Sequence, residues 1–157
     1  MTRPLIAVFM AIAVWILLLS GLVIRSRIGS ITPPWRSIFL VALGVVILAV
    51  GCWLVWKAAE HLAGAGISPF AAHAGPVLVT DGIYGRVRNP MDLGNTLVAL
   101  SPAVAIDVAA LWILPVAALL YYAGAQAPLE NHFLRERFKD RFEEYKGRVP
   151  SWTPLWK

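Results

Sequence analysis

Residues 80–94 read Thr-Asp-Gly-Ile-Tyr-Gly-Arg-Val-Arg-Asn-Pro-Met-Asp-Leu-Gly and lie between two long apolar blocks. This polar stretch also begins a helix. Asn89 suits the N-cap, Pro90 suits the first helical position, and Asp92 suits the acidic position of a capping box. The stretch therefore predicts a polar corner that the apolar remainder of the chain holds in place.

Two arginines, Arg86 and Arg88, lie just before this helix start. A helix N-terminus flanked by cations suits an anionic group. Either arginine can instead serve only to orient the chain across a membrane. For Arg86 alone, that second interpretation is favoured.

The composition predicts lipid as the main solvent. Of 157 residues, 59% are hydrophobic and only 15% are charged, which would give a soluble domain far too much exposed apolar surface. The net charge of +5 comes from basic residues at the ends of apolar segments and in the tail, so we expect no nucleic-acid partner. We expect one all-α integral membrane domain over residues 1–157.

Four apolar stretches predict four transmembrane helices. They cover residues 5–24, 37–56, 91–106 and 108–125. The first is too long for a signal peptide and is followed by arginines instead of a cleavage site. The last two are slightly short, so we expect a hairpin inserted from one side, with kinks or irregular turns at Pro102 and Pro115. The spacing of Gly44 and Gly51 suits close helix packing.

The C-terminal segment, residues 128–157, differs sharply from the apolar blocks. Its apolar side chains recur at spacings of three and four, with charged residues between them: Leu134, Phe138, Phe142 and Tyr145. This pattern predicts one amphipathic helix that lies on the membrane surface or over the corner. Its aromatic stripe is first of all a membrane-docking face.

The distribution of lysine and arginine predicts the orientation in the membrane. With four spans, the N-terminus, the loop after the second span (Lys57 and the corner at 60–90) and the C-terminal segment share one side, which holds eleven of the fourteen basic residues. The positive-inside rule therefore places both termini and the corner in the cytosol.

The corner and the tail each carry a recognisable motif. The corner residues are Gly82-Ile-Tyr84, Arg88-Asn89-Pro90-Met91 and Gly94, and the tail residues are Glu130, Leu134, Phe138, Tyr145 and Arg148-Val149-Pro150. Over residues 76–154 they resemble two patterns, Gly-x-Tyr…Arg-His/Asn-Pro-x-Tyr-x-Gly and Glu-Glu…Leu…Phe-Gly…Tyr-x-x-Tyr…Arg-Val-Pro. Both belong to the isoprenylcysteine carboxyl methyltransferase family, which is related to the phospholipid N-methyltransferases.

The resemblance implies an S-adenosylmethionine-dependent methyltransferase built in the membrane, without a Rossmann domain. The cofactor would lie between the corner and the C-terminal helix, and a membrane lipid or another lipidated or amphiphilic acceptor would enter from the bilayer. The implied cofactor-binding residues are Tyr84, Arg88, Asn89, Pro90, Met91, Asp92, Gly94, Glu130, Asn131, Leu134 and Tyr145. The helix start and Arg88 suit the methionine carboxylate, and Glu130 suits the ammonium and sulfonium groups.

Arg148 and Glu130 are the expected catalytic residues. Arg148 would orient an acceptor carboxylate for O-methylation, which the Arg-Val-Pro ending favours. In the alternative, N-methylation of a phospholipid amine, Glu130 or Asp92 would take the proton. We expect no metal, because the three histidines (His61, His73 and His132) lack ligand spacing.

The sequence departs from the family patterns at five positions. Asn89 replaces the commoner histidine, Asp92 a tyrosine, Asn131 the second glutamate, Lys139 the glycine of a Phe-Gly turn, and Phe142 a tyrosine. These departures leave open a non-catalytic membrane scaffold that keeps the fold. They also leave open that Asn89-Pro90 is only a helix cap and that Glu130 only forms a surface ion pair.

Overall fold

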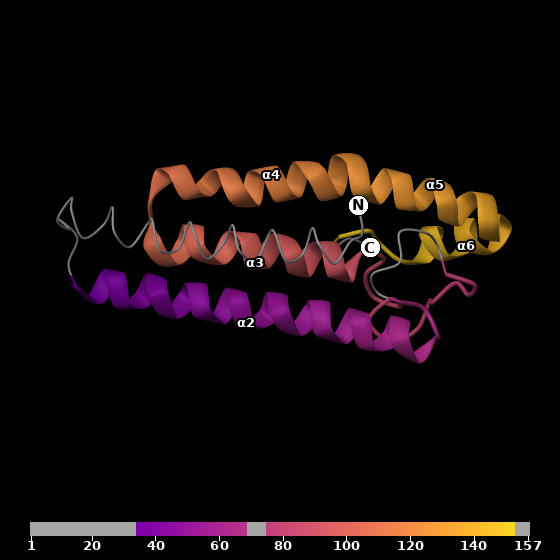
Figure 1. Ribbon diagram of the computed structural model, residues 1–157, viewed down its shortest axis with the longest axis horizontal. Coiled ribbons are helices and arrows are strands. Elements are labelled where there is room, and N and C mark those ends of the chain that lie inside the picture. Colours follow the sequence, from indigo (N-terminus) through magenta and orange to yellow (C-terminus); the bar gives the residue numbers. More distant parts are fainter. Residues whose placement is uncertain (1–33, 69–74, 153–157) are drawn as a thin grey trace.

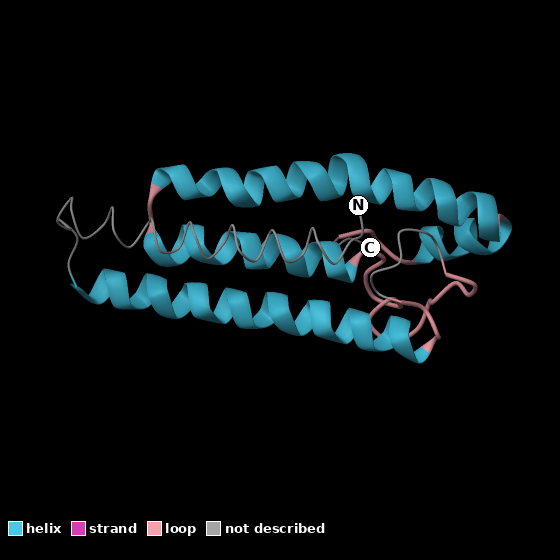
Figure 2. Ribbon diagram, in the orientation of Figure 1, coloured by secondary structure: helices cyan, strands magenta, loops and turns pink. Residues whose placement is uncertain are grey.

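The structure is a computed structural model that describes residues 34–68 and 75–152, and this part of the chain is helical with no strand. Its elements are α2 (Pro34–Gly64), α3 (Pro90–Ile106), the 3-10 turn η1 (Ala109–Trp112), α4 (Ile113–Tyr121), the π-helix η2 (Tyr122–Gln126), α5 (Ala127–Phe138) and α6 (Asp140–Arg148). Three rods lie side by side: α2, α3, and the run from η1 to α5 (Figure 1; Figure 2). The predicted span at 5–24 falls outside the described residues.

α2 is long and apolar enough to cross a bilayer. Within the described residues, Ile38–Gly64 is the one segment that meets this test of length and composition. Only 11% of its most apolar stretch is buried by the rest of the chain, whereas the core helix of a soluble protein is mostly buried. The helix continues past residue 56, where the predicted span ends. The total number of spans stays a prediction.

Glycines bring α2 and α3 into close contact. A Cβ atom added to Gly51 would lie 2.8 Å from the carbonyl oxygen of Gly94, and one added to Gly94 would lie 2.8 Å from the carbonyl oxygen of Gly51. Gly44 meets the Cβ of Ala105 and the backbone of Ser101 in the same way. The packing role predicted for Gly44 and Gly51 is confirmed, since any larger residue would push the two backbones apart.

The hairpin predicted at Asp107 is also present. Asp107 takes the left-handed conformation, with φ 56° and ψ 44°, and its N–H donates to the carbonyl of Ala103. Aspartate tolerates this conformation better than most residues, so it ends α3 and reverses the chain. An ion pair of 2.9 Å between Arg36 Nη2 and Asp107 Oδ2 joins this turn to the start of α2. α3 itself runs unbroken through Pro102.

The last predicted span does not end at residue 125, because the helical rod continues to Phe138. Pro128 has no N–H to donate to the carbonyl of Gly124, and the π-helix η2 lies at this point. The irregular turn absorbs the proline without breaking the rod. α4 and α5 therefore hold an apolar segment and a polar segment of the chain in one line (Figure 1).

The prediction of one C-terminal amphipathic helix is wrong. Lys139 has a φ of 47°, which ends α5, and α6 folds back beside it. The apolar residues that the sequence places on one helix face instead come from two helices. They meet in a cluster of Phe142, Tyr145 and Val149, against which Leu78, Leu134 and Phe138 pack.

Candidate functional site

The start of α3 is held by backbone carbonyls of Pro150 and Ser151, which follow α6. The backbone N–H of Arg88 donates to the carbonyl of Pro150 at 2.9 Å, and that of Asn89 donates to the carbonyl of Ser151 at 3.1 Å. Asn89 occupies the N-cap position and Pro90 follows it, as the sequence predicts. The Asn89 side chain, however, makes no capping hydrogen bond, which corrects the expected cap. The Asn89 N–H, which a capping box would pair with the acidic side chain at position 92, donates to the Ser151 carbonyl instead.

Arg88 joins three segments through its guanidinium group. Nε donates to the carbonyl of Val149 at 2.8 Å, Nη1 donates to Asn131 Oδ1 at 3.2 Å, and Nη2 donates to Ser151 Oγ. Burial lowers the pKa of Arg88 from its usual value, and Tyr145 and Glu143 oppose that shift. Three of its five N–H groups are thus committed to α5 and the tail.

Asn89 points its side chain into the site. It is 6% exposed, and its Nδ2 lies 3.5 Å from Glu130 Oε2 on α5. Its Oδ1 is buried and has no hydrogen-bond partner within the described residues. Burying such an oxygen costs free energy unless a hydrogen-bond donor pairs with it. Asp92, one turn along α3, is also buried, so two carboxyl groups and a buried amide oxygen belong to the same corner.

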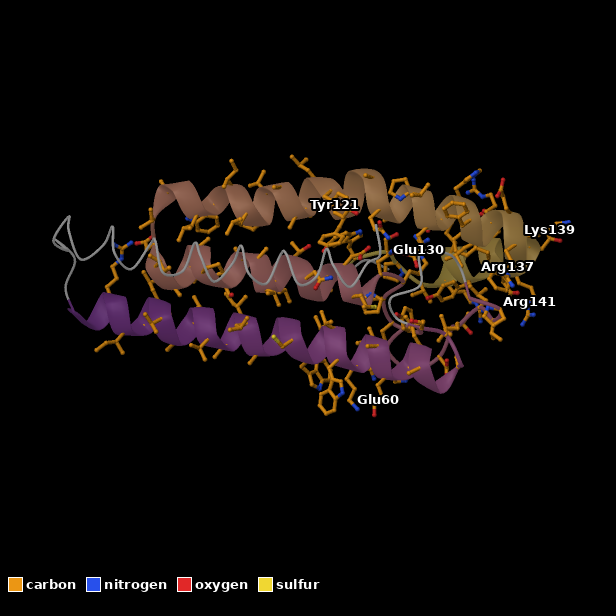
Figure 3. The ribbon with its side chains drawn as sticks, viewed as in Figure 1. Glu60, Tyr121, Glu130, Arg137, Lys139 and Arg141 are labelled. Atoms are coloured by element: carbon orange, nitrogen blue, oxygen red, sulfur yellow. The ribbon has the colours of Figure 1, made fainter. Side chains whose placement is uncertain are left out.

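Glu130 comes from the side of α5 that faces this corner. Figure 3 shows it well inside the molecule, whereas Lys139 lies at the far tip of the α5–α6 turn. Its side chain is half-buried, and the rod from η1 to α5 sets its height relative to Asn89. Glu130 is thus less exposed than a typical surface residue, and its role in binding stays a prediction.

Tyr145 closes the site on the α6 side. Its phenol donates to the carbonyl of Tyr84 at 2.7 Å, and only 3% of the residue is exposed. Burial raises the pKa of Tyr145 well above its usual value, although the nearby Arg88 cation opposes the shift. Tyr145 is therefore neutral at physiological pH and holds the Thr80–Gly94 stretch against α6.

The structure brings together most of the predicted site residues. Arg88, Asn89, Glu130 and Asn131 are linked by hydrogen bonds, and Tyr84 is linked to Tyr145. The others lie at the start of α3 or in the cluster around Tyr145: Pro90, Met91, Asp92 and Leu134.

Gly94 and Arg148 lie apart from this network. Gly94 has the position of a packing residue against α2. Arg148 is exposed and pairs with Glu144 at 3.5 Å, so its predicted catalytic role has no contact to support it. Both predicted roles stay predictions.

The contribution of the last residues was missed at the sequence level. Ser151 and the carbonyls of Val149 and Pro150 hold Arg88, and Trp152 packs against α3 and α4. The Arg-Val-Pro motif does mark this segment, but it draws attention to Arg148. No local pattern indicates that backbone carbonyls are the binding groups.

Comparison with known proteins gives two likenesses. A family model described as phospholipid methyltransferase matches residues 39–141. The chain is 33% identical over 79 residues to the protein-S-isoprenylcysteine O-methyltransferase of Schizosaccharomyces pombe. That match covers 50% of this chain and 34% of the relative, so the aligned part spans about a third of the relative's length. No solved structure matches.

Proposed function

Because the chain belongs to the phospholipid methyltransferase family, we propose that it transfers a methyl group from S-adenosylmethionine to the polar end of a lipid or lipid-modified acceptor. The observation that carries this proposal is the buried, unpartnered Oδ1 of Asn89 beside Glu130. It marks a place where a ligand with hydrogen-bond donors would satisfy an atom that the described part of the protein leaves bare.

The residues of the corner fit this methyl donor. When bound, S-adenosylmethionine supplies a methyl group on a positively charged sulfur, and it also carries an ammonium group, hydroxyls and an aromatic amine. Asn89 Oδ1 can accept a hydrogen bond from such donors, and the carboxylates of Glu130 and Asp92 favour positive charge. The neutral, buried Tyr145 excludes water from the α6 side of the corner.

Arg88 has a different part in this proposal from the one expected. Its three hydrogen bonds to Val149, Asn131 and Ser151 make it first a residue that holds the corner together. Two N–H groups remain on the guanidinium, and these stay available for the carboxylate of the donor. Holding the site and binding an anion are therefore compatible.

The acceptor is either an amine or a carboxylate. Two carboxyl groups belong to the corner, and either one can take the proton that an amine loses on methylation. Arg148, which would orient a carboxylate, instead pairs with Glu144 in an exposed position. These positions support a phospholipid amine. The printed name of the fission yeast relative supports O-methylation of an isoprenylcysteine, so the test includes both.

The proposal places the site at the cytosolic face of a multi-pass membrane protein. The apolar, outward-facing α2 supports insertion in a bilayer. The corner and the tail, which hold most of the basic residues, meet at one end of the rods (Figure 1). The positive-inside rule then assigns that end to the cytosol.

Calorimetry on the detergent-purified protein tests the cofactor. We expect saturable binding of S-adenosylmethionine and S-adenosylhomocysteine, weakened about tenfold by each of two variants. Asn89→Ala removes a hydrogen-bond acceptor, and Glu130→Gln removes the negative charge that favours the ammonium group of the ligand. Glu136→Gln is the matched control, since Glu136 lies on the same helix but is exposed and pairs with His132.

The absence of binding by the folded protein would contradict the enzyme proposal and favour a non-catalytic scaffold. If binding is found, two acceptors separate the remaining alternatives: a lipid with a primary amine headgroup and a prenylated cysteine with a free carboxylate. Methyl transfer from radiolabelled donor to one of them identifies the acceptor class.

A further inference from the structure

Residues 149–152, Val-Pro-Ser-Trp, form a short segment that we term the C-terminal strap. It follows α6 and lies beyond the residues that the family model matches. Three of its members are bonded to Arg88 or Asn89, through the Val149, Pro150 and Ser151 carbonyls and the Ser151 hydroxyl. The strap thus runs against the two residues that precede α3.

The strap fixes the backbone of Asn89 in an unusual conformation for a helix cap. Asn89 has φ −120° and ψ 59°, and its N–H donates to the Ser151 carbonyl. A capping asparagine normally turns its side chain back to the first N–H groups of the helix. Here no such bond forms, and the side chain reaches Glu130 instead. The observed direction of Asn89 therefore goes together with the docked strap.

Trp152 is the last residue of the strap and anchors it to the rods. Its side chain packs against a cluster of Ala99 on α3, Ala118 on α4 and Tyr122 at the π-helix, all nearly buried. Two alanines facing each other leave room for an indole between the helices. The cluster that Trp152 contacts contains none of the corner's polar side chains, so the indole can be removed without changing those side chains.

We propose that the C-terminal strap is a positioning element of the cofactor site, which turns the Asn89 side chain from a helix cap into a ligand-binding group. This inference rests on the proposed function, because the ligand of Asn89 is taken to be the methyl donor. In this role the strap residues do not touch the ligand. Trp152, Ser151 and the strap's partner Arg88 set the position of Asn89. Undocking of the strap leaves Asn89 free to cap α3, and the site then loses its buried acceptor.

Hydrogen exchange and calorimetry on the full-length protein test this role. Trp152→Ala is expected to speed exchange of the Arg88 and Asn89 amides about tenfold or more, because both donate to strap carbonyls. It is also expected to weaken S-adenosylhomocysteine binding about tenfold. Trp152→Phe keeps an aromatic ring in the cluster. Its amide exchange rates and its affinity for S-adenosylhomocysteine are expected to stay within about threefold of those of the native protein.

Two further variants separate positioning from general loss of structure. Ser151→Ala removes a single bond to Arg88 and is expected to shift both values in the same direction, by about threefold, with an unchanged melting temperature. Trp56→Ala, at an exposed tryptophan on α2, is the control that leaves both values unchanged.

The inference is overturned if Trp152→Ala speeds amide exchange while ligand affinity stays native, since the strap would then have no influence on the site. Unchanged exchange at Asn89 would also overturn it. If the native protein binds no ligand, the proposed function has failed. The exchange of the Asn89 amide then decides by itself whether the strap sets this residue's conformation.

Discussion

Gly82 lies against His61 at the end of α2, and its backbone has a φ of 54°. A Cβ atom at this position would overlap the imidazole ring. His61 is itself held, because its Nδ1 lies 3.0 Å from the carbonyl oxygen of Lys57. The glycine of the Gly-x-Tyr motif is therefore required for two reasons, conformation and space.

Gly82→Ala is expected to lower the free energy of unfolding by about 2–4 kcal/mol, from the cost of a positive φ and of overpacking. Gly66→Ala isolates the first cost, about 1 kcal/mol, because Gly66 has a φ of 70° with no atom near its added Cβ. Thermal unfolding in detergent measures both. The double variant Gly82→Ala/His61→Ala should recover the overpacking part, and no recovery would contradict the assigned contact.

The turn between α5 and α6 depends on the backbone conformation of one residue, Lys139, which ends α5 and precedes α6. Lys139 has φ 47° and ψ −120°, a conformation that glycine adopts readily and lysine does not. The related family pattern has glycine at this point, and the chain keeps the turn despite the lysine. The cluster of Phe142, Tyr145 and Val149 against α5 outweighs the local cost.

Lys139→Gly is expected to raise the free energy of unfolding by about 1 kcal/mol, because the positive φ is no longer strained. Lys146→Gly, inside α6, is the matched control and should lower it by about 1 kcal/mol. Chemical denaturation of the two variants beside the native protein gives the comparison. Destabilisation by Lys139→Gly would show that α5 and α6 form one helix.

For the molecule as a whole, the two ends of the rods have different character. One end holds the turn at Asp107 and its ion pair with Arg36, and the other holds the corner, the strap and α6. Cys52 lies between them on α2 and is exposed to whatever surrounds the helix. If that surrounding is lipid, water-soluble reagents cannot reach it.

Labelling with a membrane-impermeant maleimide is expected to leave Cys52 unmodified in intact membranes and to modify it after denaturation. In a Cys52→Ala background, cysteines introduced at Ala109 and Arg141 are expected to react from opposite sides of the membrane. Both positions are exposed. Ala109 begins η1 next to the turn at Asp107, and Arg141 lies in α6 at the other end of the rods (Figure 3). Reaction of both from one side would contradict the proposed orientation.

The sequence by itself determined the features that depend on neighbouring residues. Asn89-Pro90 begins α3, Asp107 makes the hairpin turn, and the small residues Gly44 and Gly51 mark where α2 meets α3. Each is a local signal, set by backbone conformation or side-chain size. The pairing of the corner with the tail came from their resemblance to the family's two motifs, and hydrogen bonds from Arg88 and Asn89 to the tail join the two segments.

Only the tertiary structure decided how that site is held. The three partners of the Arg88 side chain lie 43, 61 and 63 positions away, and two of the groups that bind the corner's backbone are carbonyls, which every residue possesses. The reversal at Lys139 was equally hidden, because packing of α6 on α5 imposes it against the preference of lysine. Asparagine is one of the residue types preferred at the N-cap of a helix, so the sequence predicts that Asn89 caps α3. Its side chain nevertheless reaches Glu130 instead of capping α3, and the distant strap accepts its backbone N–H, an arrangement that no local pattern contains.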